Sequence, residues 1–283
     1  MLKLGILGYP LEHTLSPVMQ TAALQYLNIS GEYKAYEVVE EELEKTFRRL
    51  KEEGIKGLNI TIPYKKKIIP LLDELTQTAK LIGAVNTVTF ENGRAIGDNT
   101  DVMGFWNAIP LDIKNRMNKE RTVILGCGGS AYACGVALIL SNAMNLKIYG
   151  RNKDKLEEFK KFLESRAKGL NINTNVEIGL FSDLNLKDTF LLINTTPVGM
   201  HPKTNETPVL KENLKELKSD GLVYDIIYNP PETKLLKDAK SLNLNTLNGI
   251  EMLISQGAAS IAIWLGQKVS PIGAMRLAIK QNL

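Results

Sequence analysis

The sequence predicts an α/β protein built from two domains, and three observations lead to this prediction. Apolar strand-like runs alternate with helix-like stretches from one end of the chain to the other, which indicates mostly parallel sheets. A glycine-rich turn at residues 126–133 follows one such run and opens a helix-like stretch. The length of 283 residues is enough for two domains of ordinary size, each with its own core.

The first third of the chain contains the main elements of the first domain. The expected strands are residues 3–7, 33–39 and 55–62, and the expected helices between them are residues 16–27 and 41–53. In the second helix, Leu43, Phe47 and Leu50 recur at the spacing of one helix face. This stripe predicts that the helix packs on the sheet.

A hairpin is expected next. Residues 85–90 and 94–97 are strand-like and are joined by Glu91-Asn92-Gly93. Asn-Gly suits a tight primed turn, which joins antiparallel strands. We expect this antiparallel pair to close off the first sheet.

A second α/β series begins with the strand-like residues 121–126. Its further expected strands are residues 146–149, 176–178, 190–194, 222–226 and 244–247. This order is typical of a Rossmann-like doubly wound nucleotide-binding domain. From Gly249 the pattern is helical again, and we expect this tail to return to the first domain. The predicted division is 1–102 with 248–283 for one domain and 103–247 for the other, with a cleft between them.

Composition narrows the class of protein. The apolar fraction of 44% and the charged fraction of 23% are those of an ordinary globular protein. No apolar run is long enough for a membrane span, and the N-terminus lacks a signal-peptide pattern, so we expect a cytoplasmic protein without a membrane partner. A net charge of +4, with one tight basic run at residues 65–67, gives no reason to expect nucleic acid. Two cysteines and two histidines predict neither a disulfide framework nor a metal site.

Two polar segments follow strand-like runs, and each ends on an ionisable residue. Lys65 ends residues 59–65, and Asp101 ends residues 97–101. An amine and a carboxylate delivered by two strand ends can share a proton with a bound hydroxyl or carbonyl, as an alcohol dehydrogenase without metal requires. From these segments alone, a surface lysine and a capping aspartate are the alternative.

The glycine-rich turn predicts a dinucleotide site. Glycines allow a tight turn and a close approach of the backbone to a pyrophosphate, whose charge is favoured at a helix N-terminus. The candidate residues are Gly126, Gly128, Gly129, Ser130 and Ala131. The alternative is a glycine-rich turn that binds no ligand.

The end of the next strand indicates which dinucleotide is bound. An acidic residue there would take the ribose hydroxyls of NAD, whereas an arginine accommodates the additional phosphate of NADP. Arg151 offers a permanently charged planar donor, and Lys155 adds a second charge one helical turn later, with Asn152 between them. We predict NADP as the cofactor; the alternative is a solvated helix start with scattered charge.

Seven motifs, in order along the whole chain, together resemble the shikimate dehydrogenase family of NADP-dependent oxidoreductases in aromatic amino acid biosynthesis. They are residues 8–17, 59–65, 83–87, 97–101, 194–200, 225–230 and 249–256. The resemblance implies hydride transfer from NADPH to the C3 carbonyl of 3-dehydroshikimate, with Lys65 as the acid–base residue beside Asp101. The alternatives are a quinate/shikimate dehydrogenase of broader range and, from another class, a non-catalytic sensor of a hydroxy acid.

The resemblance also implies substrate contacts. Thr14 and Ser16 would bind the substrate carboxylate, although Ser16 before Pro17 is also a typical helix start. Groups that would hold the ring hydroxyls are Thr61, Asn86, Asp101 and Gln256. Asn59 would brace the site, although Asn59 and Asn86 could each be turn residues. Tyr228 would approach substrate from across the cleft; a buried core tyrosine is the alternative.

Further cofactor contacts follow from the same resemblance. Besides the glycine-rich turn and Arg151, Asn152 and Lys155, they are Thr195, Thr196, Met200 and Gly249. We expect a small-molecule substrate as the partner and a monomer or homodimer as the assembly.

Several positions depart from the family pattern, among them Thr14, Tyr132 and Asn152. Thr14 stands where serine is usual, so the preference between shikimate and quinate is open. Tyr132 stands where an arginine commonly helps to hold the adenosine phosphate, and Asn152 replaces a threonine beside Arg151. These changes predict a reduced affinity for NADP and some use of NAD.

Overall fold

A computed structural model describes residues 1–283 and divides them into two compact units. One unit is Met1–Gly104 with Ile254–Leu283, and the other is Phe105–Leu253. The divisions fall inside two helices, α4 (Asp101–Ala108) and α10 (Ile250–Leu265), each of which contributes residues to both units. The sequence boundaries at 102 and 248 lie near the beginnings of these helices, because strand and helix patterns mark element ends rather than contacts.

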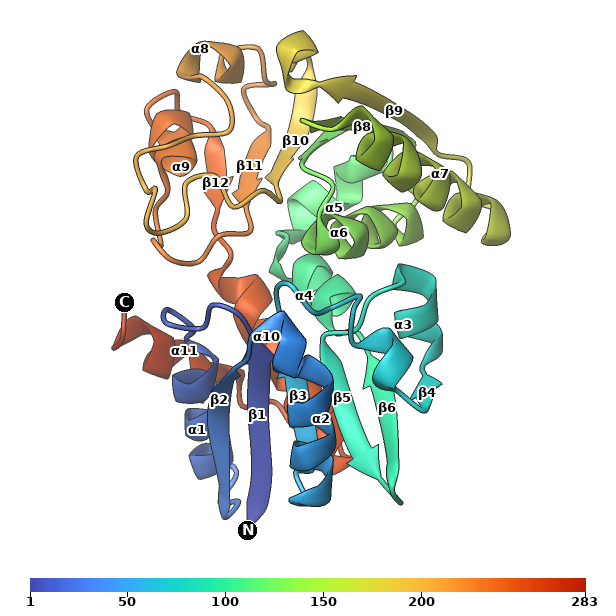
Figure 1. Ribbon diagram of the computed structural model, residues 1–283. Coiled ribbons are helices and arrows are strands. Elements are labelled where there is room, and N and C mark those ends of the chain that lie inside the picture. The colour runs from blue at the N-terminus through green and yellow to red at the C-terminus, as the bar shows by residue number, and fades with distance from the viewer. The chain divides into compact units, whose positions relative to one another are not determined.

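The first unit is built on a six-stranded mixed sheet (Figure 1). Its strands are β1 (Leu2–Gly8), β2 (Gly31–Glu37), β3 (Gly57–Ile60), β4 (Glu74–Leu75), β5 (Thr87–Glu91) and β6 (Arg94–Asp98). Their spatial order is β2-β1-β3-β5-β6-β4. Strand β1 pairs in parallel with β2 and β3, and β5 pairs antiparallel with β3 and β6. The sheet therefore brings the carboxyl ends of β1, β2 and β3 to the same edge.

The hairpin prediction is confirmed, but the prediction that it closes the sheet is wrong. Asn92 and Gly93 have φ angles of 51° and 75°, as a primed turn requires. Strand β4 pairs in parallel with β6 and forms the edge instead. With two residues, β4 is too short to show a strand pattern in sequence. The second and third strands also differ from prediction: β2 begins and ends two residues earlier than expected, and β3 is shorter at both ends.

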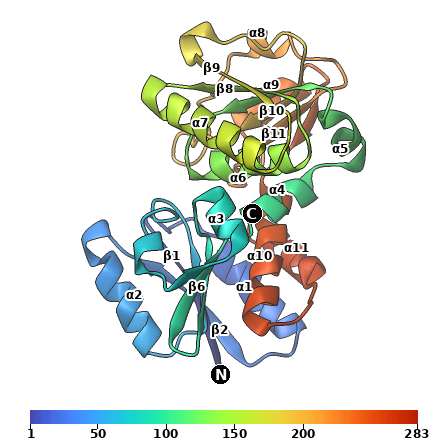
Figure 2. The ribbon, with the colours of Figure 1, turned by 90° about the vertical axis from the view of Figure 1, so that its right-hand side faces the viewer.

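Helices cover both faces of this sheet. They are α1 (Ser16–Tyr26), α2 (Leu43–Glu52), α3 (Gln77–Ile82), the later part of α10, and α11 (Ile272–Lys280), with 3₁₀ segments at Glu40–Glu42 and Ile69–Leu71. Helix α2 lies on one face, and α1, α10 and α11 lie on the other (Figures 1 and 2). The predicted stripe of Leu43, Phe47 and Leu50 is buried in the core, against residues such as Leu58 and Val88. Burial of this apolar face is what holds α2 on the sheet.

The second unit is a doubly wound domain, as predicted. Its strands are β7 (Arg121–Leu125), β8 (Asn145–Gly150), β9 (Asn175–Leu180), β10 (Thr189–Asn194), β11 (Leu222–Asp225) and β12 (Asn245–Leu247). The order is β12-β11-β10-β7-β8-β9, and every neighbouring pair is parallel. The strand order reverses between β7 and β10, which is where ligands bind in open parallel sheets.

Helices and one 3₁₀ segment connect these strands: α6 (Gly129–Leu140), α7 (Lys153–Gly169), the 3₁₀ segment Phe181–Asp183, α8 (Lys211–Leu214) and α9 (Lys234–Lys240). Helix α5 (Leu111–Met117) precedes β7. Side chains from α8 and α9 pack with Val123 and Leu125 of β7 on one face. From β7 the strands β8 and β9 extend the sheet in the direction opposite to β10, β11 and β12. Helices α6 and α7, which follow β7 and β8, therefore cover the opposite face. No helix combines the length and the apolar character that a membrane span requires.

Candidate active site

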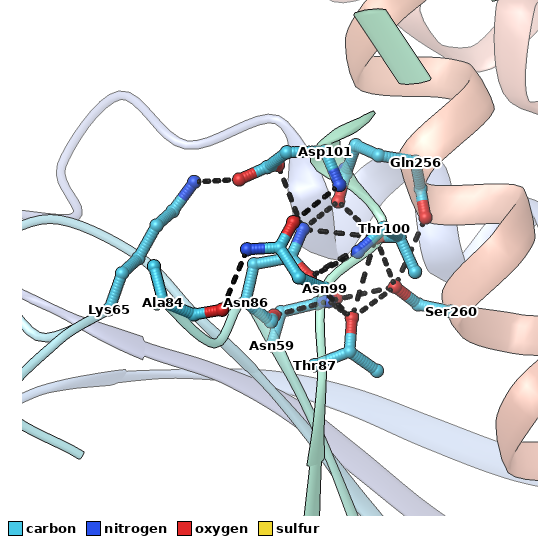
Figure 3. A network of polar contacts seen from close by, with 10 residues as sticks. All are labelled: Asn59, Lys65, Ala84, Asn86, Thr87, Asn99, Thr100, Asp101, Gln256 and Ser260. Atoms are coloured by element: carbon cyan, nitrogen blue, oxygen red, sulfur yellow. Dashed lines mark hydrogen bonds and ion pairs between the residues drawn. The ribbon is translucent and has the colours of Figure 1, made fainter. Parts of the chain in front are cut away.

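The structure brings Lys65 and Asp101 together in the first unit (Figure 3). Lys65 Nζ lies 2.6 Å from Asp101 Oδ2, and the side chains are 15% and 7% exposed. Lys65 follows β3 through a turn in which Tyr64 is buried and donates a hydrogen bond to the carbonyl of Val38. Asp101 begins α4 just after β6. Two strand ends separated by 36 positions therefore place an amine beside a carboxylate in a largely buried setting.

Asn86 connects this ion pair to a polar network. Its Nδ2 donates to Asp101 Oδ1 at 2.8 Å and to Thr100 Oγ1 at 2.9 Å. Its Oδ1 accepts from the backbone N–H of Thr100 at 2.8 Å and from the Thr87 hydroxyl at 2.9 Å. Asn86 is 2% exposed and bonded through both ends of its amide, so it is more than a turn residue. Gln256 of α10 contributes its Oε1, 3.4 Å from Asn86 Nδ2.

The hydroxyl residues of the N-terminal loop lie at the start of α1. The Thr14 hydroxyl accepts from the backbone N–H of Ser16 at 3.3 Å, and Ser16 is 5% exposed. The interpretation of Ser16 as the cap is wrong, because Leu15 is the N-cap residue and makes no side-chain cap. The Ser16 hydroxyl therefore does not serve as the cap, which leaves the carboxylate-binding interpretation in place.

Thr61 follows β3, next to the loop that contains Thr14. Its backbone N–H donates to the carbonyl of Leu7 at 3.0 Å, and its carbonyl accepts from the N–H of Tyr64 at 2.8 Å. A Cβ on Gly8 would collide with the Thr61 methyl group. The absence of a side chain at Gly8 lets these two strand ends approach each other.

In the second unit, the glycine-rich turn links β7 to α6. Gly126 has a φ of 99°, which favours glycine, and its N–H donates to the carbonyl of Tyr149 at 2.7 Å. Gly128 is exposed and is the N-cap residue of α6, so the first N–H groups of a 12-residue helix lie at this turn. Ser130 is partly exposed, whereas the Ala131 side chain is fully buried and its N–H donates to the Gly128 carbonyl. The turn has the backbone donors and the open space that a pyrophosphate requires.

Arg151, Asn152 and Lys155 lie at the carboxyl end of β8 and are all exposed. Asn152 is the N-cap residue of α7, and its Oδ1 accepts from the N–H of Lys155 at 2.9 Å. A cap of this kind stabilises the helix start whether or not a ligand is bound. The two cationic side chains are therefore presented to solvent around a fixed helix end.

Comparisons with known proteins show sequence and structural similarity along the whole chain. A model of the shikimate dehydrogenase substrate binding domain matches residues 6–88. The shikimate dehydrogenase (NADP(+)) of Crocosphaera subtropica is 41% identical over 283 residues, covering 99% of this chain and 96% of that protein. The chain belongs to the shikimate dehydrogenase family.

Other family members match over similar lengths. The shikimate dehydrogenase (NADP(+)) of Methanococcus maripaludis is 42% identical over 265 residues, covering 93% of this chain and 92% of that protein. A crystal structure of a shikimate dehydrogenase in complex with NADP⁺ is similar with a TM-score of 0.88 and 37% identity, covering 100% of this chain and 96% of that one. The family resemblance inferred from seven motifs is confirmed.

Tyr132, a departure from the family pattern, belongs to the core of the second unit. Its ring is 5% exposed and stacks on Phe159 with centroids 4.5 Å apart. Its hydroxyl donates to Glu158 Oε1 at 3.3 Å. Burial and the nearby Glu158 carboxylate raise the pKa of Tyr132 to about 12, so it stays neutral. Tyr132 joins α6 to α7 and presents no positive charge to a phosphate.

The segment after β10 is held by hydrogen bonds to its own unit. The Thr195 hydroxyl donates to the carbonyl of Leu125 at 2.7 Å. The Thr196 N–H and hydroxyl both donate to Asn194 Oδ1, at 3.0 and 2.7 Å. Both threonines are partly exposed and lie beside Gly126, while Met200 is 43% exposed. The structure therefore brings Thr195 and Thr196 to the glycine-rich turn.

Asp225 holds this segment through hydrogen bonds to Asn194 and Thr233, although the sequence pattern gave it no individual role. It is fully buried at the end of β11 and accepts from Asn194 Nδ2 at 3.0 Å and from the Thr233 hydroxyl at 2.7 Å. Burial raises the pKa of Asp225 to about 6, although its hydrogen bonds act in the opposite direction. Its position in the motif of residues 225–230 was the available signal.

Tyr228 and Gly249 lie in the same unit. Tyr228 is partly exposed, so the alternative of a buried core tyrosine is wrong; Tyr224 is the fully buried one. The N–H of Gly249 donates to the carbonyl of Ile227 at 3.0 Å. A Cβ at Gly249 would collide with the carbonyl oxygen of Ile226, so backbone packing explains this glycine without a ligand.

Proposed function

We propose that the protein is an NADP-dependent shikimate dehydrogenase that reversibly reduces 3-dehydroshikimate to shikimate in aromatic amino acid biosynthesis. The observation that carries the proposal is the Lys65–Asp101 pair at 2.6 Å, set in a buried polar network. The reaction requires a proton for the oxygen at C3 when hydride adds to that carbon. A lysine ammonium held beside a carboxylate can supply that proton.

The polar groups around the pair suit a polyol. Asn86 and Gln256 carry amides, and Thr61 carries a hydroxyl, so each can donate to or accept from a ring hydroxyl. Thr14 and Ser16 offer neutral donors for the substrate carboxylate. Together these side chains would orient the ring so that its C3 oxygen faces Lys65.

In the reducing direction, the Lys65 ammonium donates its proton to the oxygen that develops negative charge at C3. Before the transfer, the positive charge of Lys65 stabilises that oxygen. Asp101 holds the amine in place by accepting from it, and its second oxygen is held by Asn86. In the oxidising direction, the neutral amine takes the proton from the C3 hydroxyl.

The second unit has the residues that would hold NADP. The backbone donors of Gly128 and Gly129 suit the pyrophosphate, and Arg151 and Lys155 suit the phosphate of the adenosine ribose. Thr195 and Thr196 lie beside the glycine-rich turn. When bound, the reduced cofactor supplies the hydride.

The test is an absorbance assay of NADPH consumption with 3-dehydroshikimate, repeated with NADH and with 3-dehydroquinate. The proposal expects the highest kcat/KM for 3-dehydroshikimate with NADPH. Because Thr14 adds a methyl group beside the carboxylate-binding hydroxyls, the change in the ratio between the two substrates from wild type to Thr14→Ser measures the effect of that methyl group. Failure to oxidise NADPH with either substrate would overturn the proposal.

A cytoplasmic location and a monomeric or homodimeric state stay predictions. Size-exclusion chromatography with light scattering tests the second of them.

A further inference from the structure

Beyond Asn86, away from the Lys65–Asp101 pair, lies a series of buried polar side chains to which the proposed reaction assigns no role. Tyr33, Asn59, Thr87 and Ser260 are each no more than 6% exposed. In that order they come from β2, β3, β5 and α10. Figure 3 shows Asn59, Thr87 and Ser260. We call Tyr33, Asn59, Ser260, Thr87 and Asn86 the hydrogen-bond chain.

Tyr33 sets the direction in which the hydrogen bonds of the hydrogen-bond chain are donated. Burial raises the pKa of the Tyr33 hydroxyl well above its ordinary value, so the hydroxyl keeps its proton. It donates to Asn59 Oδ1 at 2.7 Å. Because a carbonyl oxygen can only accept, this bond fixes the orientation of the Asn59 amide. Asn59 Nδ2 consequently faces Ser260 Oγ at 3.0 Å and donates to it.

The next two links each carry a single hydroxyl proton. Thr87 donates its proton to Asn86 Oδ1 at 2.9 Å, so it has none left for Ser260. The contact of 2.9 Å between the Thr87 and Ser260 oxygens therefore requires Ser260 to be the donor. The other acceptors near Ser260 lie farther away. The carbonyl of Gln256 is at 3.1 Å and already accepts a backbone hydrogen bond within α10, and the Thr100 hydroxyl is at 3.4 Å.

The hydrogen-bond chain ends at the Lys65–Asp101 pair. Since Asn86 Oδ1 accepts from Thr87 and from the Thr100 N–H, Asn86 Nδ2 must face Asp101 Oδ1, 2.8 Å away. The reversed amide would place its oxygen against the carboxylate. Every donor from Tyr33 to Asn86 thus points toward Asp101, whose other oxygen accepts from Lys65.

We propose that Tyr33, Asn59, Ser260 and Thr87 are positioning residues that hold the Asn86 amide in the orientation that donates to Asp101. This inference rests on the proposed function. None of the four touches Lys65 or Asp101 in a hydrogen bond, so they act through Asn86. Loss of one link loosens the Asn86 amide and, with it, the placement of the carboxylate that holds the Lys65 amine.

The first test compares Thr87→Val with Thr87→Ser. Valine keeps the shape and removes the hydroxyl, whereas serine keeps the hydroxyl. We expect Thr87→Val to lower kcat about tenfold, the effect of one buried hydrogen bond, while KM for 3-dehydroshikimate changes by less than about twofold. Thr87→Ser restores kcat. Thr122→Val is the matched control, because Thr122 is fully buried in the second unit and its hydroxyl has no hydrogen-bond partner.

The second test is a double-mutant cycle between Tyr33→Phe and Thr87→Val. If the residues act as one chain, Tyr33→Phe lowers kcat in the wild-type background and changes it by less than about twofold once Thr87→Val has broken the chain. If the two effects multiply, the residues act independently and the chain is refuted. Should Thr87→Val fail to fold, the cycle is measured with Ser260→Ala.

Two further measurements on wild type and Thr87→Val are the affinity for shikimate and the temperature of thermal unfolding. Calorimetric titration with shikimate is expected to show a much smaller loss of affinity than of kcat in Thr87→Val, because Asn86 is one of several groups proposed to hold the ring. A wild-type protein without activity would refute the proposed function. An active wild type whose Thr87→Val variant loses only thermal stability would refute the positioning role and leave the proposed function intact.

Discussion

Asp225 makes stability depend on pH in a direction opposite to that of most carboxylates. Burial raises its pKa from 3.8 to about 6 in the folded state. The folded protein therefore binds this proton more tightly than the unfolded chain does. Stability from this group is fully present below about pH 4 and is lost as the pH rises through about 6. Since one pKa unit corresponds to about 1.4 kcal/mol, the rise is worth about 3 kcal/mol.

Asp225→Asn removes this titration and keeps the size of the side chain. We expect the free energy of unfolding of the wild type, minus that of the variant, to increase by about 3 kcal/mol as the pH falls from about 7 to about 4. Paired carboxylates such as Glu120 and Glu177, whose pKa values are lowered by Lys218 and Lys147, act in the opposite direction. They are common to both proteins and cancel in the difference.

The assay is urea unfolding at successive pH values. Trp106 lies in the same unit as Asp225, whereas Trp264 lies in the other. Fluorescence in a Trp264→Phe background therefore reports the unfolding of the second unit. Asp188→Asn, which removes an exposed carboxylate of the same unit, controls for the change in net charge. A difference that stays constant with pH, or that increases toward neutral pH, would refute the reasoning.

Three further outcomes are expected. Lys65→Ala is expected to lower kcat by about 100 to 10,000-fold with a small change in shikimate affinity; stopped-flow and steady-state kinetics measure this, and near-normal turnover would remove the acid–base assignment. Arg151→Asp is expected to raise KM for NADPH far more than KM for NADH, and unchanged NADPH kinetics would count against the phosphate role. Gly249→Ala is expected to destabilise the fold by about 1–3 kcal/mol, because its Cβ meets the Ile226 carbonyl; chemical denaturation measures this, and a variant as stable as wild type would contradict it.

Local patterns were sufficient for the parts of the fold that repeat. The alternation of strands and helices predicted both sheets, and Asn92-Gly93 predicted the hairpin, because each depends on neighbours in sequence. Strand β4 was missed because two residues carry no pattern. Ser16 begins α1, as the expected helix over residues 16–27 indicated, but the N-cap position falls one residue earlier, on Leu15, because side-chain preferences do not fix a helix end to a single residue.

The sequence predicted the site residues that follow strand ends, but not the buried residues that support them. Lys65 and Asp101 are ionisable residues at the ends of polar segments, so their meeting could be expected. The hydroxyls of Thr87 and Ser260 resemble those of many other buried residues, and they lie 173 positions apart in the chain. Only the fold shows that they are partners.

If Arg151 and Lys155 hold the adenosine phosphate as proposed, the exposed helix start at Arg151, Asn152 and Lys155 makes the choice of dinucleotide separable from the rest of the protein. Arg151 and Lys155 are exposed and lie outside the core, and replacing Asn152 by aspartate, serine or threonine preserves a cap. On the proposed phosphate role, natural or laboratory selection could therefore change the coenzyme preference in a few steps, with little loss of folding stability.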